Sequence, residues 1–169
     1  MEYKAMNGIS NEEKDIINEL AKMIDPQRLQ HSIGVKECAE MLANLYDEDE
    51  QKAATAGLLH DCAKGFDDDQ LIQKAIEYNI ELDSVSLYQK GLIHGPLGAK
   101  IANHVFGVRD GDILSAIEYH TYGRKDMTVL EKIIFLADLI EPSRDYPSVE
   151  ELRSLAQQNL DKAIMKAMD

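Results

Sequence analysis

The sequence predicts an all-α protein, and three observations carry that prediction. Apolar residues recur at three- and four-residue intervals along most of the chain, as they do in amphipathic helices. Serine, threonine, aspartate and proline stand where such helices would begin. No segment alternates apolar and polar residues over the length of a strand. Because no long linker interrupts the 169 residues, we expect one helical domain over residues 1–169.

Start and stop signals place the individual helices. In chain order, the expected helices cover residues 10–24, 26–46, 50–62, 68–78, 96–107 and 110–120, followed by two that begin near 128 and 148. A short apolar segment lies near 84–88. Asp25 and Pro26 supply an N-cap and a first helical residue for the second helix. Three further starts are capping boxes, in which a serine or threonine precedes a glutamate by three residues: Ser10 with Glu13, Thr128 with Glu131, and Ser148 with Glu151.

Charge and composition exclude several classes of protein. The 31 acidic residues outnumber the 18 Lys and Arg residues and give a net charge of -13, opposite in sign to the surface of a duplex nucleic-acid binder. The apolar run 133–140 is too short to cross a bilayer, and the N-terminus lacks the pattern of a signal peptide. Cys38 and Cys62 are too few for a disulfide framework. We expect a cytoplasmic protein with free thiols and no membrane partner; a homodimer is one of the oligomeric states left open.

The histidines carry the functional information. His31 follows helical spacing with Val35, Cys38, Leu42 and Leu45, which places it at the inner end of an apolar stripe. Taken alone, a hydrogen-bonded core histidine would give the same pattern. The interpretation of His31 as a ligand therefore depends on the other polar residues that stand in apolar surroundings.

Two carboxylates stand in such surroundings. His60 and Asp61 end an alanine-rich, nearly uncharged helix, and Asp138 lies in the middle of the apolar run 133–140. A buried carboxylate is costly unless a cation or hydrogen bonds compensate it. Adjacent helical residues point about 100° apart, so His60 and Asp61 can hold one ion only from a helix end that leans over a cavity. For Asp138, a buried cap or salt bridge is the alternative.

The remaining histidines differ in setting. His120 is in helical register with Ile113 and Ile117, and His94 precedes Gly-Pro at the mouth of a helix. His104 has no charged companion, so an ordinary structural role is expected for it. The candidate metal ligands are thus His31, His60, Asp61, His94, His120 and Asp138. This mixed nitrogen and oxygen set suits iron, manganese, cobalt or zinc better than calcium or magnesium, and a helical bundle can bring it together.

Several basic residues stand close in sequence to these candidates. Arg28 precedes His31 by three residues, Lys64 follows His60 by four, Arg124 follows His120 by four, and Arg144 follows Asp138 by six. In an acidic protein, cations beside a metal suggest a site for an anion, and guanidinium groups fit phosphate oxygens well. Solvated charges at helix ends are the alternative for each residue taken singly.

In chain order these residues form a recognisable series: Arg-Leu-Gln-His-Ser-Ile-Gly-Val at 28–35, His-Asp-Cys-Ala-Lys at 60–64, His-Gly-Pro-Leu-Gly-Ala at 94–99, Tyr-His-Thr at 119–121 and Phe-Leu-Ala-Asp-Leu-Ile-Glu-Pro-Ser-Arg at 135–144. The series resembles the HD-domain phosphohydrolase superfamily, and more narrowly its bacterial symmetrical bis(5'-nucleosyl)-tetraphosphatases. The segment from Leu136 to Pro142, followed by Arg144, favours this branch. The sequence lacks the Gly-Tyr-Pro signature of the cyclic-dinucleotide phosphodiesterases.

The resemblance implies an all-α HD fold with a metal site in its core, and hydrolysis of diadenosine tetraphosphate and similar dinucleotides to two nucleoside diphosphates. It implies that a divalent transition metal, iron first and manganese, cobalt or zinc otherwise, is held by His31, His60, Asp61 and Asp138. His94 and His120 match residues that either complete a second metal position or touch substrate phosphate. The positions that would face the phosphates are Arg28, Lys64, Thr121 and Arg144, to which the spacing argument adds Arg124.

The expected chemistry assigns catalytic roles to two residues. Asp61 would ligate metal and orient the attacking water, and Lys64 would steady the leaving diphosphate. Two other functions stay open. The chain could be an HD phosphohydrolase that acts on a nucleoside monophosphate or deoxynucleotide, or a nucleotide sensor without turnover. Product analysis distinguishes the first, and the complete set of candidate ligands argues against the second.

Overall fold

The computed structural model describes residues 11–169, which are helical and contain no strand, so the all-α prediction is confirmed for this range. The elements are α1 (Asn11–Leu20), α2 (Pro26–Leu45), α3 (Glu50–Leu59), α4 (Asp68–Glu77), α5 (Ser84–Tyr88), the 3-10 helix η1 (Lys90–Ile93), α6 (His94–His104), α7 (Gly111–Tyr119), α8 (Val129–Ile140), α9 (Val149–Ala156) and α10 (Leu160–Met168). Ser10, the first half of one predicted capping box, lies outside the described residues.

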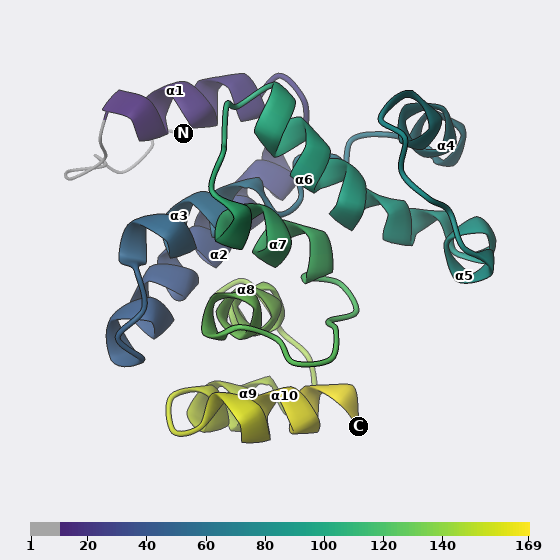
Figure 1. The fold of residues 1–169 in the computed structure, drawn as a ribbon. Coiled ribbons are helices and arrows are strands. Elements are labelled where there is room, and N and C mark those ends of the chain that lie inside the picture. The colour runs from purple at the N-terminus through teal and green to yellow at the C-terminus, as the bar shows by residue number, and fades with distance from the viewer. Residues whose placement is uncertain (1–10) are drawn as a thin grey trace.

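Helices α2, α3, α7 and α8 form the centre of the bundle. Helix α2 packs on α3 and α8, and α7 packs on α3, α6 and α8. Figure 1 shows α9 and α10 as a layer beneath α8, and α4 with α5 as an extension beside α6. The buried side chains of these helices form one apolar cluster, in which Leu42, Leu58, Ile117 and Ile134 are fully enclosed. The polar site is built within this packed centre.

Two predicted helix starts have the expected chemistry. The side chain of Asp25 accepts a hydrogen bond from the backbone N–H of Arg28, and Pro26 is the first residue of α2. Thr128 and Glu131 form a complete capping box at the start of α8. Each cap satisfies backbone N–H groups that have no partner within the helix. The sequence signals were therefore sufficient to place the beginnings of the two helices that carry His31 and Asp138.

The C-terminal prediction is wrong in two respects. Ser148 has a φ of 72° and its side chain makes no cap hydrogen bond, so the predicted capping box with Glu151 does not form. An N-cap residue must be extended for its side chain to reach back to the helix, and a left-handed residue is not. The chain after Val149 also forms two helices rather than one, because Asn159 caps a separate α10 through the N–H of Lys162.

Other boundaries differ by less, and one difference matters for the site. Helix α3 ends at Leu59, so His60 and Asp61 lie at and beyond its end rather than inside it. Helix α6 begins at His94, two residues before Pro96, because η1 leads directly into it. Leu45, which we expected in the apolar stripe of His31, is 50% exposed because it lies in the last turn of α2.

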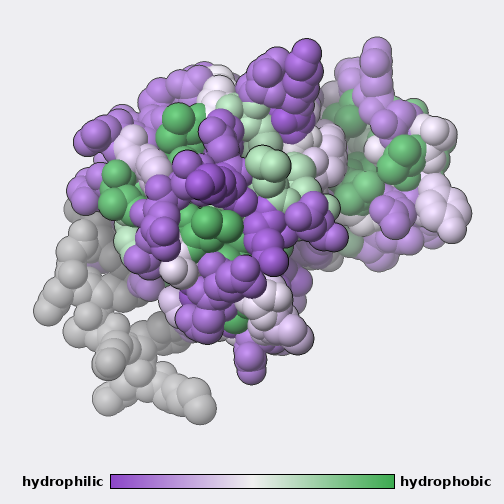
Figure 2. Space-filling model, turned by 90° about the horizontal axis from the view of Figure 1, so that it is seen from below, coloured by the Kyte–Doolittle hydropathy of each residue, from purple (hydrophilic) through white to green (hydrophobic). Residues whose placement is uncertain are grey.

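The face of the molecule on the side of α9 and α10 is mostly hydrophilic where it is coloured in Figure 2. Seen from the side of α9 and α10, hydrophobic residues form small separate patches among hydrophilic ones (Figure 2). Met165 and Met168 of α10 are among the exposed hydrophobic residues of the described chain. Within residues 11–169, none of the helices has the length and apolar character needed to cross a membrane.

Candidate metal centre

Five helices bring the candidate ligands to one place. The ligands are His31 in α2, His60 and Asp61 after α3, His94 at the start of α6, His120 after α7, and Asp138 in α8. The four histidines and Asp61 are buried, while the side chain of Asp138 is 19% exposed. All six predicted ligands therefore form one cluster, which opens to solvent on the Asp138 side.

Two glycines allow the helices to approach closely enough for this cluster to form. A Cβ atom built on Gly57 would lie 3.0 Å from the Cα of Lys36, where α3 crosses α2. A Cβ on Gly95 would lie 2.6 Å from the backbone oxygen of Glu118, where the start of α6 meets the end of α7. The first contact brings His60 near His31, and the second brings His94 near His120.

Asp61 lies at the centre of the cluster. Its Oδ2 atom is 3.5 Å from the Nε2 of His60 and 3.9 Å from the Nε2 of His31. Its Oδ1 atom is 3.2 Å from the Nε2 of His94 and 3.4 Å from the Nε2 of His120. One carboxylate thus faces two histidine pairs, one with each oxygen.

Asp138 completes the first pair. Its Oδ1 atom is 3.0 Å from the Nε2 of His31 and 3.6 Å from the Nε2 of His60. The potential ligand atoms of His31, His60 and Asp138 lie within 4.8 Å of one another, and so do those of His60, Asp61 and His120. Each of these groups could hold a metal ion.

The outer nitrogens of the histidines fix how the rings point. In three of them Nδ1 faces a backbone carbonyl oxygen three residues earlier, to which it must donate: His60 to Gly57, His94 to Gly91 and His120 to Ile117. In the neutral ring, each Nε2 is then an acceptor that points inward. The buried Nε2 of His60 has no hydrogen-bond partner, and the Nε2 atoms of His94 and His120 face each other at 3.1 Å. Inward nitrogens beside two carboxylates favour positive charge between them, either as protons on the rings or as a metal ion, and metal-binding histidines are oriented in this way.

Glu141 is a functional residue that the sequence reasoning missed. Its Oε1 atom lies 3.0 Å from the Nδ1 of His31, the position that a carbonyl occupies for the other three histidines. Glu141 is 1% exposed and also accepts a hydrogen bond from the backbone N–H of Ser143. Burial raises the pKa of Glu141, but hydrogen bonds from Ser143 and His31 lower it below its ordinary value. In the sequence, the feature that could have indicated this role is the position of Glu141, directly after an apolar helix and directly before a proline.

The turn after α8 is held from outside by Arg153 of α9. The guanidinium donates to the backbone oxygens of Ile140, Glu141 and Arg144 at 2.8 to 2.9 Å. These carbonyls lie at or beyond the C-terminal end of α8, where helical partners are lacking. Arg153 thereby fixes the backbone that presents Glu141 and Arg144 to the centre.

The charges within the centre are strongly coupled. Burial lowers the pKa of His60, but the combined effect of Asp61 and Asp138 is larger and raises the pKa to about 10. Burial raises the pKa values of Asp61 and Asp138, yet the surrounding histidines bring both well below their ordinary range. For His120, burial is the largest effect and lowers the pKa. The two carboxylates are therefore ionised and stabilise positive charge between them.

Three of the predicted basic residues lie at the centre. Arg28 donates to Asp61 Oδ2 at 2.8 Å, and Arg144 donates to Asp138 Oδ1 at 2.8 Å. The Nζ atom of Lys64 lies 3.3 Å from the Nδ1 of His94. The guanidinium of Arg144 thus contacts a candidate ligand directly, and its expected contact with substrate phosphate stays a prediction.

Two other predicted residues are placed differently. The guanidinium of Arg124 donates three hydrogen bonds to Glu131 and lies 5.0 Å from the ring centre of Tyr119, so it is engaged away from the ligands. The buried Oγ1 of Thr121 has no hydrogen-bond partner. His104 is exposed and packs edge-on against Tyr78, in line with the ordinary role expected for it.

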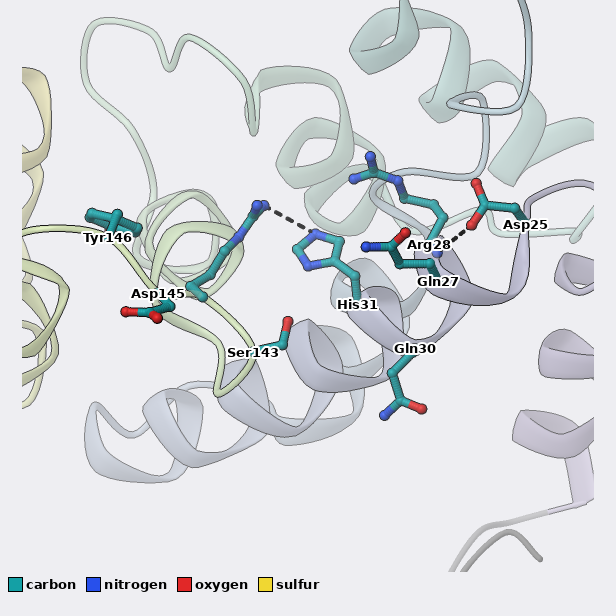
Figure 3. A pocket seen from close by; sticks show the side chains of 9 residues that line it. Asp25, Gln27, Arg28, Gln30, His31, Ser143, Asp145 and Tyr146 are labelled. Carbon is teal, nitrogen blue, oxygen red and sulfur yellow. Dashed lines mark hydrogen bonds between the residues drawn. The ribbon is translucent and has the colours of Figure 1, made fainter. Parts of the chain in front are cut away.

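A cavity of about 560 Å³ opens from the centre (Figure 3). One wall comes from the beginning of α2 and the other from the turn after α8. The lining residues are Asp25, Gln27, Arg28, Gln30, His31, Ser143, Arg144, Asp145 and Tyr146. The cavity therefore joins one candidate ligand, His31, to two guanidinium groups.

Comparison with known proteins identifies this arrangement. The family model of the HD domain matches residues 28–143, the span that contains all six candidate ligands. The chain belongs to the HD-domain family. Within residues 28–143 the HD dipeptide itself is His60-Asp61, at the centre of the cluster.

Similar HD-domain proteins define the branch. A symmetrical bis(5'-nucleosyl)-tetraphosphatase of Halalkalibacterium halodurans is 44% identical and covers 83% of this chain and 75% of its own. The protein of the same name from Staphylococcus aureus is also 44% identical, over 86% of this chain and 76% of its own. This HD-domain chain thus belongs to the family of these tetraphosphatases, as the sequence motifs indicated.

A solved structure has the same fold. The crystal structure of a predicted HD superfamily hydrolase involved in NAD metabolism from Clostridium acetobutylicum has a TM-score of 0.89 and 41% sequence identity to this chain. The match covers 91% of this chain and 82% of the other. The arrangement of helices around the centre is therefore that of an HD hydrolase.

Proposed function

We propose that this HD-domain protein hydrolyses dinucleoside tetraphosphates, diadenosine tetraphosphate among them, symmetrically to two nucleoside diphosphates. The observation that carries the proposal is a buried cluster of four histidines and two aspartates that opens into a cavity with two guanidinium groups. The cluster of histidines and aspartates suits a metal-dependent hydrolase, and the two guanidinium groups in the cavity suit a substrate with several phosphates. The names of relatives that are 37 to 44% identical support the same activity.

The residues present fit a divalent transition metal, for which iron is our first proposal and manganese, cobalt and zinc the alternatives. His31, His60, Asp61 and Asp138 would hold one ion. His94 and His120, with the other oxygen of Asp61, would hold a second. When bound, such ions supply the Lewis-acid chemistry that activates water at neutral pH and offsets charge on phosphate oxygens.

The protein's own residues would position the substrate. Arg28 and Arg144 each donate a hydrogen bond to a carboxylate of the centre, Asp61 and Asp138 respectively. Their remaining N–H groups can bind phosphate oxygens. Lys64, exposed beside His94, would neutralise the leaving diphosphate. Asp61 would orient the attacking water, because its carboxylate reaches both halves of the cluster. Thr121 stays a weaker candidate for phosphate contact, and for Arg124, whose guanidinium is bonded to Glu131, we propose a structural role instead.

Product analysis tests this proposal. The purified protein, loaded in turn with iron, manganese, cobalt or zinc, is incubated with diadenosine tetraphosphate, and the products are separated by anion-exchange chromatography. We expect ADP as the sole nucleotide product. AMP together with ATP would contradict symmetric cleavage. Turnover of mononucleotides alone would favour a different HD phosphohydrolase, and tight binding without turnover would favour a sensor.

We also propose a cytoplasmic location, a nucleotide as the small-molecule partner, and the absence of a duplex nucleic-acid partner. The two cysteines support the cytoplasmic location. Cys38 and Cys62 are free and buried, and burial raises the pKa of each thiol to about 12. Such thiols are unreactive and suit a reducing compartment. Sedimentation analysis of the purified protein would test whether it forms the homodimer that the sequence left open.

A further inference from the structure

The cavity beside His31 has an aromatic residue, Tyr146, in its outer wall, and phosphate binding alone does not explain an aromatic ring there. The Nη2 atom of Arg144 lies 3.4 Å from the Nε2 of His31. Tyr146, which also lines the cavity, lies at the far left of Figure 3, well away from His31. From the centre outward, the cavity thus presents an imidazole, a guanidinium and an aromatic ring. A volume of about 560 Å³ lies within the range typical of small-molecule sites.

This order matches the order of groups in half of a dinucleotide. Starting at the phosphorus that reacts, a nucleoside diphosphate presents its two phosphates, then ribose, then the base. With the reacting phosphate at the His31 end, the other phosphate would lie near Arg144 and the base near Tyr146. The proposed substrate therefore supplies, in the same sequence, the groups that the cavity walls can bind.

Tyr146 is held in a way that suits stacking. Its hydroxyl donates to the backbone oxygen of Leu139 at 2.9 Å, which ties the ring to the last turn of α8. The residue nevertheless keeps 37% of its surface exposed. A ring with a fixed edge and an accessible surface loses little conformational freedom when a base packs on it. Nucleic-acid bases stack on such rings with little regard to base identity, because every base has a π-face.

The opposite wall offers a polar group. The side-chain amide of Gln27, at the beginning of α2, points into the cavity between Arg28 and His31 (Figure 3). Within residues 11–169 this amide has no hydrogen-bond partner, so its donor and acceptor are free for a ligand. Gln30, by contrast, points away from His31 in the same view.

We propose that this cavity is the nucleoside subsite for one half of the substrate, with the base stacked on Tyr146, the phosphates on Arg28 and Arg144, and Gln27 facing the nucleoside. The proposal rests on the proposed function, because it assumes that the substrate phosphate lies at the metal centre. It identifies Tyr146 as the residue that recognises a nucleoside as distinct from a bare polyphosphate. Adenine and guanine should be accepted alike.

The test compares a ligand with a base against one without. Isothermal titration calorimetry on the metal-loaded protein measures the Kd values of ADP and of inorganic pyrophosphate for the wild type, Tyr146→Ala and Tyr146→Phe. We expect Tyr146→Ala to weaken ADP binding roughly 10- to 100-fold, the usual contribution of one stacked base, and to leave pyrophosphate binding unchanged. Tyr146→Phe keeps the ring and should bind both ligands as the wild type does.

Tyr122→Ala is the matched control. Tyr122 is half exposed and lines a different cavity, between the α4–α5 connection and the helices α6 and α7, so its removal should leave both affinities unchanged. Its T-shaped contact with Tyr119 lies outside the proposed subsite. A loss of ADP affinity in Tyr122→Ala as large as that in Tyr146→Ala would show that the effect is not specific to the subsite.

Four results would overturn the proposal. ADP could bind the wild type no more tightly than pyrophosphate, or bind Tyr146→Ala as tightly as the wild type. Tyr146→Phe could lose as much as Tyr146→Ala, which would assign the effect to the anchor on Leu139. Both ligands could weaken equally in Tyr146→Ala, which would assign it to the position of Arg144. Because binding is measured without turnover, a protein that binds ADP through Tyr146 but does not hydrolyse the dinucleotide would contradict the proposed function alone.

Discussion

The two ends of α8 have similar residues and use them differently. Before the helix, Arg124 pairs with Glu131; after it, Arg144 pairs with Asp138, and the closest nitrogen–oxygen distance is 2.8 Å in both pairs. The carboxylate oxygens of Glu131 accept hydrogen bonds from the backbone N–H of the capping residue Thr128, from Ser115 and from Arg124. Asp138 instead turns one oxygen toward His31 and His60. The first pair holds the fold, and the second belongs to the site.

The comparison shows which feature separates a structural arginine from a functional one. Both arginines stand a few residues from a ligand candidate in sequence, so spacing does not distinguish them. The carboxylate that each arginine contacts does distinguish them. The oxygens of Glu131 are bonded to the capping box, Ser115 and Arg124, whereas Asp138 also faces the imidazoles of His31 and His60.

Replacing Asp138 should have the largest effect. Asp138→Asn keeps the shape of the side chain but removes the charge that faces His31 and His60. We expect metal affinity to fall by more than the roughly 10- to 100-fold that loss of an outer partner costs, with loss of hydrolysis. Metal titration followed by calorimetry measures the affinity. Metal should raise the melting temperature of the wild type but not of the variant, and equal increases would return Asp138 to a structural role.

Glu141→Gln tests the residue that orients His31. The amide keeps the volume of the carboxylate but not its charge, so His31 becomes a weaker and less well-oriented ligand. We expect metal affinity to fall roughly 10- to 100-fold while the protein stays folded. Glu131→Gln, at the other end of α8, is the matched control and should leave metal affinity unchanged. If the two variants bound metal equally well, Glu141 would have no role in the centre.

Arg144→Ala and Arg124→Ala compare the two arginines directly. A hydrogen bond to a charged group contributes about 1.5 to 3 kcal/mol, so Arg144→Ala should lower kcat/KM for the dinucleotide by roughly 10- to 100-fold. Arg144→Lys should recover part of that loss, because lysine keeps the charge without the two-pronged contact.

The matching Arg124→Ala variant should keep wild-type kcat/KM and melt at a lower temperature, since its partner is the capping residue Glu131. Steady-state kinetics and thermal denaturation of the three variants provide both measurements. A normal rate in Arg144→Ala, or a slow one in Arg124→Ala, would reverse our assignment of the two ends.

The smallest predicted effect is a dependence of stability on pH. Burial raises the pKa of Glu131, but hydrogen bonds from Arg124 and Ser115 lower it below its ordinary value of 4.5. A carboxyl group with a lowered pKa in the folded protein stabilises it above its unfolded pKa, and the stabilisation is lost as the pH falls through the folded value. The difference in stability between wild type and Glu131→Gln should therefore be largest at neutral pH and shrink below about pH 4. A difference that stays constant down to pH 2 would contradict this origin.

Much of the fold could be predicted from local signals, since Asp25, Pro26 and the Thr128–Glu131 box determine helix starts through neighbouring residues. The failure at Ser148 has a physical reason: a capping box specifies a side-chain pattern but not the backbone angle, and here the turn from Tyr146 imposes a left-handed residue. The break between α9 and α10 contains neither glycine nor proline, the two strongest signals for an interruption.

The ligand cluster was predictable because polar residues in apolar helices are conspicuous in a sequence. The role of Glu141 was not, because it depends on the approach of α8 to α2 across 110 residues of chain. The pairing of Arg124 with Glu131, seven residues later, was not predicted either, because spacing from His120 does not reveal that the turn before α8 brings the two side chains together.

The central claim is that Asp61 joins histidines from α2, α3, α6 and α7 into one metal centre. Metal analysis of the wild type and Asp61→Asn, each purified without oxygen and titrated with iron or manganese during thermal denaturation, tests it most directly. We predict that the wild type binds metal stoichiometrically and is stabilised by about 2.7 kcal/mol at 100 times the Kd, while folded Asp61→Asn binds none. Equal metal content and equal stabilisation in the two proteins would contradict the claim.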